Sequence, residues 1–145
     1  MTKVDLNSPS VQSYLTILQS VISRMAANSA GCKTWCITLV SAVIVIIADK
    51  DKPNYIWISI VPVALFLVLD SYYLSLERQF RGTYNDFIRK LHNEIATVED
   101  VFYVNPKSGI CATSLSIFKA MASMSVCPFY ALLALMLLIV RICVL

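Results

Sequence analysis

Three apolar stretches interrupt the 145-residue chain, at residues 35–48, 55–69 and 120–140. The hydrocarbon core of a bilayer is roughly 30 Å thick, and a helix rising about 1.5 Å per residue needs about 20 residues to cross it. The third stretch meets this length, since the 21 residues between Lys119 and Arg141 carry no charge. The second reaches it when the interfacial tyrosines after Asp70 are included, and the first when Lys33 extends back to the headgroups. The pattern predicts three transmembrane helices, at residues 32–48, 55–76 and 120–141.

Composition agrees with an integral membrane protein. Apolar residues make up 58% of the chain and charged residues only 14%, whereas a soluble domain carries about 25% charged residues. A signal peptide is the competing interpretation of the first stretch. It is disfavoured because 34 residues precede Trp35 and because Ala48-Asp49-Lys50 is a poor cleavage site. We therefore expect the first stretch to be a retained anchor.

The N-terminal segment, residues 1–31, is predicted to form an amphipathic helix. Ser8 suits the N-cap and Pro9 the first helical position. Apolar residues then recur at helical spacing, at positions 11, 14, 15, 18, 21, 22 and 25. Arg24 is the only charge in this helix, so packing against another protein helix is favoured over binding to a lipid surface. The small residues at 26–31 allow a close helix crossing or a bend before the first span.

The second helix is expected to continue past the membrane to about residue 96, with a kink at Pro62 and a hinge at Gly82. Residues 101–104 are β-prone, and a helix from about Ile110 should lead into the third span. The resulting order is an external turn at 49–54, a cytoplasmic helical extension and loop at 77–119, and an external C-terminus at 142–145.

The distribution of positive charge predicts the orientation. With a cytoplasmic N-terminus, nine of the twelve Lys and Arg residues lie inside, and only Lys50, Lys52 and Arg141 lie outside. The positive-inside rule favours this multi-pass topology. The net charge of +3 is too small and too scattered to indicate nucleic-acid binding, so the lipid bilayer is the expected surroundings.

Chemistry-bearing residues are scarce. The chain has one histidine, His92, and three glycines, and it contains no phosphate-binding loop and no nucleophile or metalloprotease motif. Its five cysteines form no Cys-x-x-Cys pair. We therefore expect no enzyme, no cofactor and no catalytic or metal site.

Several charged residues are candidates for contacts within an oligomer or with a ligand. Asp70 could line a cation path, pair with Arg24 or Lys33, or mark the headgroup level. A cluster of Asp70, Glu77, Arg78 and Arg81 could form an inter-subunit salt-bridge network, bind an anionic ligand, or be a solvated face. Glu77 and Arg81 have the stabilising order for an i,i+4 pair, while Lys33 and Trp35 are typical of an interfacial anchor.

Residues 69–81, Leu-Asp-Ser-Tyr-Tyr-Leu-Ser-Leu-Glu-Arg-Gln-Phe-Arg, resemble a Leu-Asp-x-Tyr-Tyr-Leu-x-x-Glu-Arg-x-Phe-Arg pattern of the RipA-type family of small bacterial octameric inner-membrane proteins. A second motif, which contains Arg24, Asn28, Lys33 and Trp35, is also similar to one in related proteins. The resemblance implies a homo-oligomer in the bacterial inner membrane, octameric in that family, without assigning a reaction.

We therefore expect an all-α integral membrane protein that assembles as a homo-oligomer. The leading hypothesis is a pore or membrane-perturbing effector gated through its cytoplasmic helices, a build also frequent among phage-defence effectors. The polar residues Thr38, Ser41, Ser59 and Asp70 would then meet neighbours or a central channel. The alternatives are a non-conducting scaffold that recruits a cytoplasmic protein partner, and a receptor for a small anionic ligand.

Overall fold

The fold was analysed in a computed structural model that describes residues 8–49, 53–106 and 110–143. This part of the chain contains helices and no β-strands. Residues 1–7 of the predicted cytoplasmic N-terminus, residues 144–145 of the predicted external C-terminus, and residues 50–52 of the predicted turn at 49–54 lie outside the described residues. The helical elements, in chain order, are α1 (Pro9–Asp49), η1 (Pro53–Ser59), α2 (Ile60–His92), η2 (Val98–Asp100), α3 (Ile110–Met121) and α4 (Cys127–Cys143).

Helix α1 is continuous over 41 residues, so the amphipathic helix and the first predicted span are one element about 61 Å long. It begins at Pro9 as predicted, and the Ser8 carbonyl accepts hydrogen bonds from the backbone N–H groups of Val11 and Gln12. The small residues at 26–31 do not break it. A single glycine destabilises a helix by only about 1 kcal/mol relative to alanine. The residues on both sides of Gly31 are helical.

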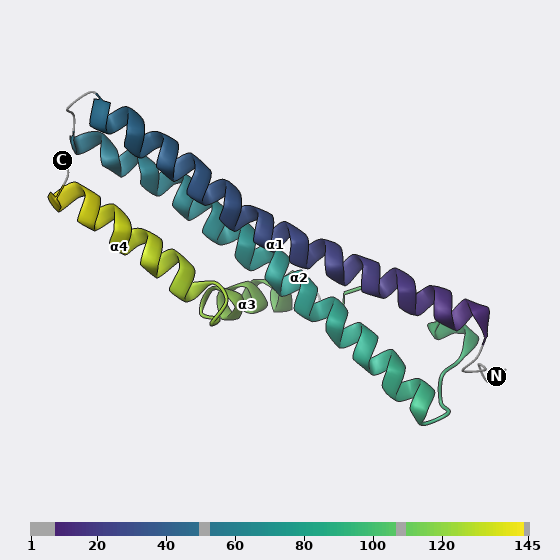
Figure 1. The fold of residues 1–145 in the computed structure, drawn as a ribbon. Helices are drawn as coiled ribbons and strands as arrows, with labels where there is room; N and C mark the ends of the chain where they lie inside the picture. The colour runs from purple at the N-terminus through teal and green to yellow at the C-terminus, as the bar shows by residue number, and fades with distance from the viewer. Residues whose placement is uncertain (1–7, 50–52, 107–109, 144–145) are drawn as a thin grey trace.

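Helices α1 and α2 form a long antiparallel hairpin, which is the largest unit of the fold (Figure 1). The 3₁₀ segment η1 precedes α2, which runs without interruption from Ile60 to His92. This confirms a second helix that extends far beyond the apolar stretch. The predicted kink in the middle of a span is wrong, because Pro62 lies in the first turn of α2, where proline is tolerated. Gly82 lies within the uninterrupted helix.

The predicted third span is interrupted. A helix does begin at Ile110, but α3 ends at Met121 and α4 starts only at Cys127. The backbone between them turns, with the Ser123 carbonyl accepting hydrogen bonds from Val126 and Cys127. Pro128 supplies the physical reason, since it has no N–H to continue a helix and disfavours helical geometry before it. At 17 residues, α4 is about 26 Å long, so the apolar run at 120–126 does not contribute to it.

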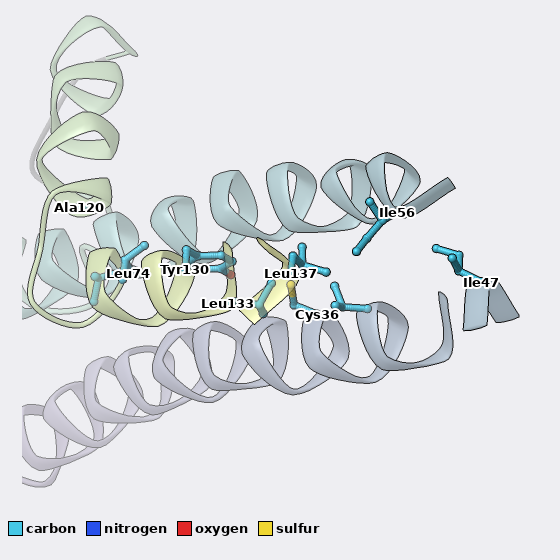
Figure 2. Packing of buried hydrophobic residues seen from close by; sticks show 10 residues of the cluster. Cys36, Ile47, Ile56, Leu74, Ala120, Tyr130, Leu133 and Leu137 are labelled. Carbon is cyan, nitrogen blue, oxygen red and sulfur yellow. The ribbon is translucent and has the colours of Figure 1, made fainter. Parts of the chain in front are cut away.

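Helices α3 and α4 add a third layer to one half of the hairpin. Figure 1 shows α4 running beside the half of the hairpin that contains the end of α1 and the start of α2, whereas α3 lies near the middle of the hairpin. Figure 2 shows α3 at a steep angle to α4. The predicted β-prone run at 101–104 forms no strand, since it is a turn followed by irregular backbone after η2. Phe102 has a φ of 67°, a conformation that disfavours a strand.

The buried apolar residues form two separate clusters. The larger joins the apolar parts of α1, α2, η1 and α4 with Ala120 of α3 (Figure 2). The smaller lies at the open end of the hairpin, where α1 begins and α2 ends. We call this open end, residues 9–18, 84–92 and 93–106, the hairpin tip. The members of the smaller cluster are Val11, Tyr14, Leu18, Phe87, Leu91 and Ala96.

The amphipathic face predicted for the N-terminal segment therefore does pack against a protein helix, and that helix is α2 of the same chain.

Two helical segments, Pro9–Ala48 and Tyr55–His92, are long and apolar enough to cross a membrane. Only 22% of the residues in the most apolar window of each are buried, whereas the core helix of a soluble protein is mostly buried. Their exposed apolar side chains match a lipid environment. The third apolar helix, Cys127–Ile142, is shorter.

Candidate functional site

The most unusual polar group in the fold is the carboxylate of Asp70, which is 0% exposed. It projects from α2 toward α1, where Ser29 and Lys33 lie one helical turn apart on the same face. The Lys33 ammonium Nζ is 2.6 Å from Oδ2, and the Ser29 hydroxyl donates a hydrogen bond to Oδ1. Lys33 Nζ also lies 3.5 Å from Ser29 Oγ, so the three groups form one closed triangle.

Helix α4 completes this enclosure with two adjacent aromatic residues. The Phe129 ring lies 5.9 Å from Lys33 Nζ, within the range of a cation–π contact. The Tyr130 hydroxyl is buried near the Asp70 carboxylate and makes no hydrogen bond to the described residues. The Phe129 and Tyr130 rings meet edge to face with centroids 4.9 Å apart. Three helices thus converge on one charge pair. We call Ser29, Lys33, Asp70, Phe129 and Tyr130 the junction.

The geometry of the junction explains how a charge is tolerated there. A buried carboxylate is stable only when it is both paired and hydrogen-bonded. Asp70 has a cation on one oxygen and a hydroxyl donor on the other, and Lys33 keeps 21% of its side chain exposed. The junction is therefore built to hold α1, α2 and α4 in register. Asp70 is fully buried in the single chain, so it does not line an open ion path there.

A ladder of polar residues extends from the junction along α2. Ser71, Ser75 and Gln79 follow at four-residue intervals and all three are buried. Ser71 donates to the carbonyl of Leu67, and the Gln79 amide donates to Ser75 Oγ. Thr83 continues the ladder, since its hydroxyl lies within hydrogen-bond distance of the carbonyls of Gln79 and Asn105. Small and amide side chains on this face allow neighbouring helices to approach closely.

The structure divides the predicted charge cluster into separate pairs. Asp70 pairs with Lys33 on another helix, while Glu77 pairs with Arg81 on α2 at 2.7 Å, as the i,i+4 spacing predicts. Arg81 is 60% exposed, and Arg78 is exposed beside it. Seven residues along a helix, or about 10 Å, separate Asp70 from Glu77. Asp70 therefore does not form one network with the exposed arginines of α2.

Of the two predicted partners of Asp70, the structure selects Lys33 over Arg24. Arg24, Asn28 and Trp35 are exposed on α1 and do not face the junction. Sequence reasoning missed Ser29 and Tyr130. The position of Ser29 four residues before Lys33 was a usable signal, because it puts both side chains on one helical face. Tyr130 gives no such signal, since its contact depends on where α4 docks.

Cys32, Cys36 and Cys127 are free thiols, and Cys127 at the start of α4 is exposed. Cys32 and Cys36 are buried on one face of α1 and are not in a disulfide. No group of three or more His, Cys, Asp or Glu side chains that could hold a metal ion occurs among the described residues.

The hairpin tip combines a polar clasp with an exposed apolar loop. Lys90 Nζ lies 2.5 Å from Asp100 Oδ1, and the backbone N–H and hydroxyl of Thr97 both donate to Oδ2. The hydrogen bond from Lys90, followed by those from Thr97, holds the pKa of Asp100 below its usual value. The Tyr14 hydroxyl donates to the Tyr103 carbonyl at 2.7 Å, and burial raises the pKa of Tyr14.

Beyond this clasp, the loop presents four large apolar side chains that are each more than half exposed: Ile95, Val98, Phe102 and Tyr103.

Comparison with known proteins gives no family for the chain. No protein-family model, no curated protein and no solved structure matches it.

Proposed function

We propose that the chain is a multi-pass protein of the bacterial inner membrane, with a cytoplasmic N-terminus, whose copies assemble into a pore or membrane-perturbing effector. The two long apolar helices support the membrane placement, and the charge distribution supports the orientation. The motif resemblance at residues 69–81 points to the same membrane and to a homo-oligomer.

The observation that carries the assembly is an exposed face of α1 that is rich in small residues. Residues at alternating intervals of three and four lie along one side of this helix, and nine of the eleven are small or carry a hydroxyl. All but Ile44 are exposed. We call this set the small-residue face: Ser13, Thr16, Ser20, Ser23, Ala27, Ala30, Thr34, Ile37, Ser41, Ile44 and Ala48.

This face differs from the other exposed surfaces at the same depth. Leu132, Leu138 and Ile139 on α4 are large apolar residues, as expected against lipid. Small and hydroxyl residues gain little from lipid contact, but they let helix backbones approach closely and form interhelical hydrogen bonds. Several copies of α1 turned toward a common axis would cover the face and line the axis with hydroxyl groups.

Of the four polar residues expected to meet a channel or a neighbour, two are exposed and two are buried. Thr38 and Ser41 are exposed on α1 and remain available to a lining, whereas Asp70 and Ser59 are buried within the subunit. Phage defence is one setting for such an assembly, and the gating would act through the long cytoplasmic part of the hairpin.

The assembly is tested by native mass spectrometry of Ala30→Leu, with Ala131→Leu as the matched control. Both alanines are exposed, but only Ala30 belongs to the small-residue face. We expect a ring of six or more copies for the wild-type protein and for Ala131→Leu, and loss of the ring for Ala30→Leu. A monomeric or dimeric wild-type protein would refute the proposal.

Conduction is tested separately in planar bilayers. We expect Ser41→Phe to reduce the conductance of the assembled protein, because Ser41 lies on the proposed axis, and Leu65→Phe on α2 to leave it unchanged. An intact ring that does not conduct would instead support a scaffold.

The scaffold has its own supporting observation, which is the apolar loop of the hairpin tip. Ile95, Val98, Phe102 and Tyr103 are exposed far along the hairpin from the apolar stretches, where contiguous apolar surface marks protein contacts. A cytoplasmic protein partner would bind there. The receptor for an anionic ligand gains less support, because Arg81, Arg89 and Lys90 each contact a carboxylate.

A further inference from the structure

The apolar part of the fold has a polar rim at each end. At the inner rim of the proposed orientation, Lys33 of α1 pairs with Asp70 of α2 and lies over the Phe129 ring of α4, so the three helices share one polar level. At the outer rim, the Arg141 guanidinium of α4 lies 5.4 Å from the centre of the Trp57 ring of η1. Figure 1 shows the end of α1, the start of α2 and the end of α4 together at this outer end. Contacts between helices therefore define both borders of the apolar part.

The distance between the two rims is short on each of the three helices. Trp57 and Asp70 are about 20 Å apart along η1 and α2, and Phe129 and Arg141 are about 18 Å apart along α4. Residues 34–48 of α1 carry no charge and extend about 22 Å. We call the surface between the rims the apolar belt. The hydrocarbon core of a bilayer is roughly 30 Å thick, so the apolar belt is about 10 Å too short for it.

Aromatic side chains mark the same two levels on the exposed surface. The two tryptophans of the chain, Trp35 on α1 and Trp57 on η1, are 63% and 54% exposed and lie at opposite rims. Tyr72 lies near the inner rim and Tyr55 near the outer rim, and both are exposed. Tryptophan and tyrosine favour the headgroup level of a bilayer. The aromatic residues therefore enclose the same short belt as the polar contacts do.

The junction prevents the belt from being lengthened at the inner rim. Lys33 would lengthen it by extending toward the headgroups, but its Nζ is held 2.6 Å from Asp70 Oδ2. Asp70 is fully buried, so it is fixed at its level. Tilting a helix only shortens its reach across the bilayer, and a ring of identical chains keeps the same belt. The adjustment that remains for a short span is local thinning of the bilayer.

Helix α3 and the turn after it add exposed apolar surface at the inner rim. Figure 2 shows α3 at a steep angle to α4, so α3 lies near the plane of a membrane that α4 crosses. Leu115 and Phe118, three residues apart on α3, are each more than half exposed, and Met124 in the turn is 94% exposed. The acyl chains of a thinned inner leaflet would cover these side chains, which would otherwise face water.

We propose that the chain thins the bilayer around it by about 10 Å and therefore gathers phospholipids with short acyl chains. The apolar belt recognises the length of the acyl chains and not the headgroup. A thinner hydrocarbon core is a smaller barrier to ions, so thinning would give the proposed effector a way to perturb a membrane. This inference rests on the proposed membrane placement but not on the pore.

The test is a lipid competition measured by tryptophan fluorescence. The full-length protein is reconstituted in equal mixtures of dimyristoleoyl and dioleoyl phosphatidylcholine, which differ only in chain length, with one or the other lipid brominated. Bromine quenches a nearby tryptophan, so the quenching reports which lipid contacts the protein. Trp57→Phe leaves Trp35 as the reporter of the inner rim, and Trp35→Phe leaves Trp57 as the reporter of the outer rim. We expect both reporters to contact the shorter lipid in about fivefold excess.

Arg141→Leu is the variant that lengthens the belt. Ile142 and Cys143 follow it in α4 and are uncharged, so the substitution adds about 5 Å of apolar helix at the outer rim. It should reduce the excess of the shorter lipid at Trp57 and leave the excess at Trp35 unchanged. Arg89→Leu, an equal charge loss at the exposed hairpin tip, should leave both unchanged.

Thinning itself is measured by electron cryomicroscopy of the wild-type protein in vesicles of dioleoyl phosphatidylcholine. We expect the two headgroup layers to lie about 10 Å closer together beside the protein than away from it. Uniform spacing, or equal contact of both reporters with the two lipids, would overturn the inference. Quenching by neither lipid would refute the membrane placement and the proposed function with it. A monomer that gathers the shorter lipid would support this inference and refute the proposed assembly alone.

Discussion

The contact between α1 and α2 is held together differently at the hairpin tip and at the junction near the middle of α1. At the hairpin tip, large apolar side chains meet, and Tyr14 packs edge to face on Phe87 with centroids 4.8 Å apart. At the junction, the contact is instead made by Asp70, Ser29 and Lys33. The hydrophobic effect can drive association at the tip if water surrounds it, but between helices in lipid that driving force is missing. The same pair of helices therefore uses apolar packing at the tip and polar pairing at the junction.

Breaking the junction should have the largest effect on stability. Lys33→Met leaves the fully buried Asp70 carboxylate without its cation, which costs about 3–5 kcal/mol of unfolding free energy in comparable buried pairs. Reversible unfolding in detergent, followed by circular dichroism, measures this loss.

The double variant Lys33→Met/Asp70→Asn provides the control for the pair. It removes both charges and keeps a side chain that Ser29 can bond, so it should recover most of the loss. Arg81→Gln, which breaks an exposed pair on one helix, should cost only about 0.3–0.5 kcal/mol. A double variant as unstable as Lys33→Met would mean that Lys33 acts by packing and not by pairing.

Apolar packing at the tip gives the next largest effect. Leu18 is 0% exposed in the tip cluster, so Leu18→Ala should cost about 2–5 kcal/mol through lost contacts and a cavity. Leu65 is 56% exposed on α2, and Leu65→Ala should change the unfolding free energy little, because its side chain faces lipid in either state. Unfolding of both variants in the same detergent checks the contrast. Equal losses would place Leu65 in an apolar interface instead of in lipid.

The sequence predicted those features that depend on neighbours along the chain. Pro9 at the start of α1, the long α2 and the pair between Glu77 and Arg81 all follow from local rules, and all are confirmed. The sequence left undecided whether α1 would continue through residues 26–31, because small residues permit either a bend or a close helix crossing. The preference for the crossing depends on Asp70, which contacts Ser29 across 41 positions of sequence.

The interrupted third span shows another limit of hydropathy. The 21 uncharged residues at 120–140 satisfy a length criterion, but such a count ignores backbone geometry. Pro128 limits helix formation on its N-terminal side, and this local constraint outweighs the apolar pattern. The docking of Tyr130 at the junction then follows from where α4 begins. Without that starting point, no spacing rule links Tyr130 to Asp70.

The smallest expected effect is a dependence of the tip on pH. The pKa of Asp100 is lowered by Lys90 and Thr97, so the folded state binds this proton more weakly than the unfolded state does. The resulting stabilisation is complete above the ordinary pKa of 3.8 and is lost as the pH falls through the lower pKa of the folded state. Acidification should therefore loosen the loop at 97–103.

Hydrogen exchange of the loop between about pH 5 and 2.5, corrected for the intrinsic exchange rate, measures this change. Asp100→Asn should remove the pH dependence, because its side chain does not titrate. Glu99→Gln, one residue away and without the clasp to Lys90, should retain it. If acid loosened the loop equally in Asp100→Asn, the clasp could not be the cause.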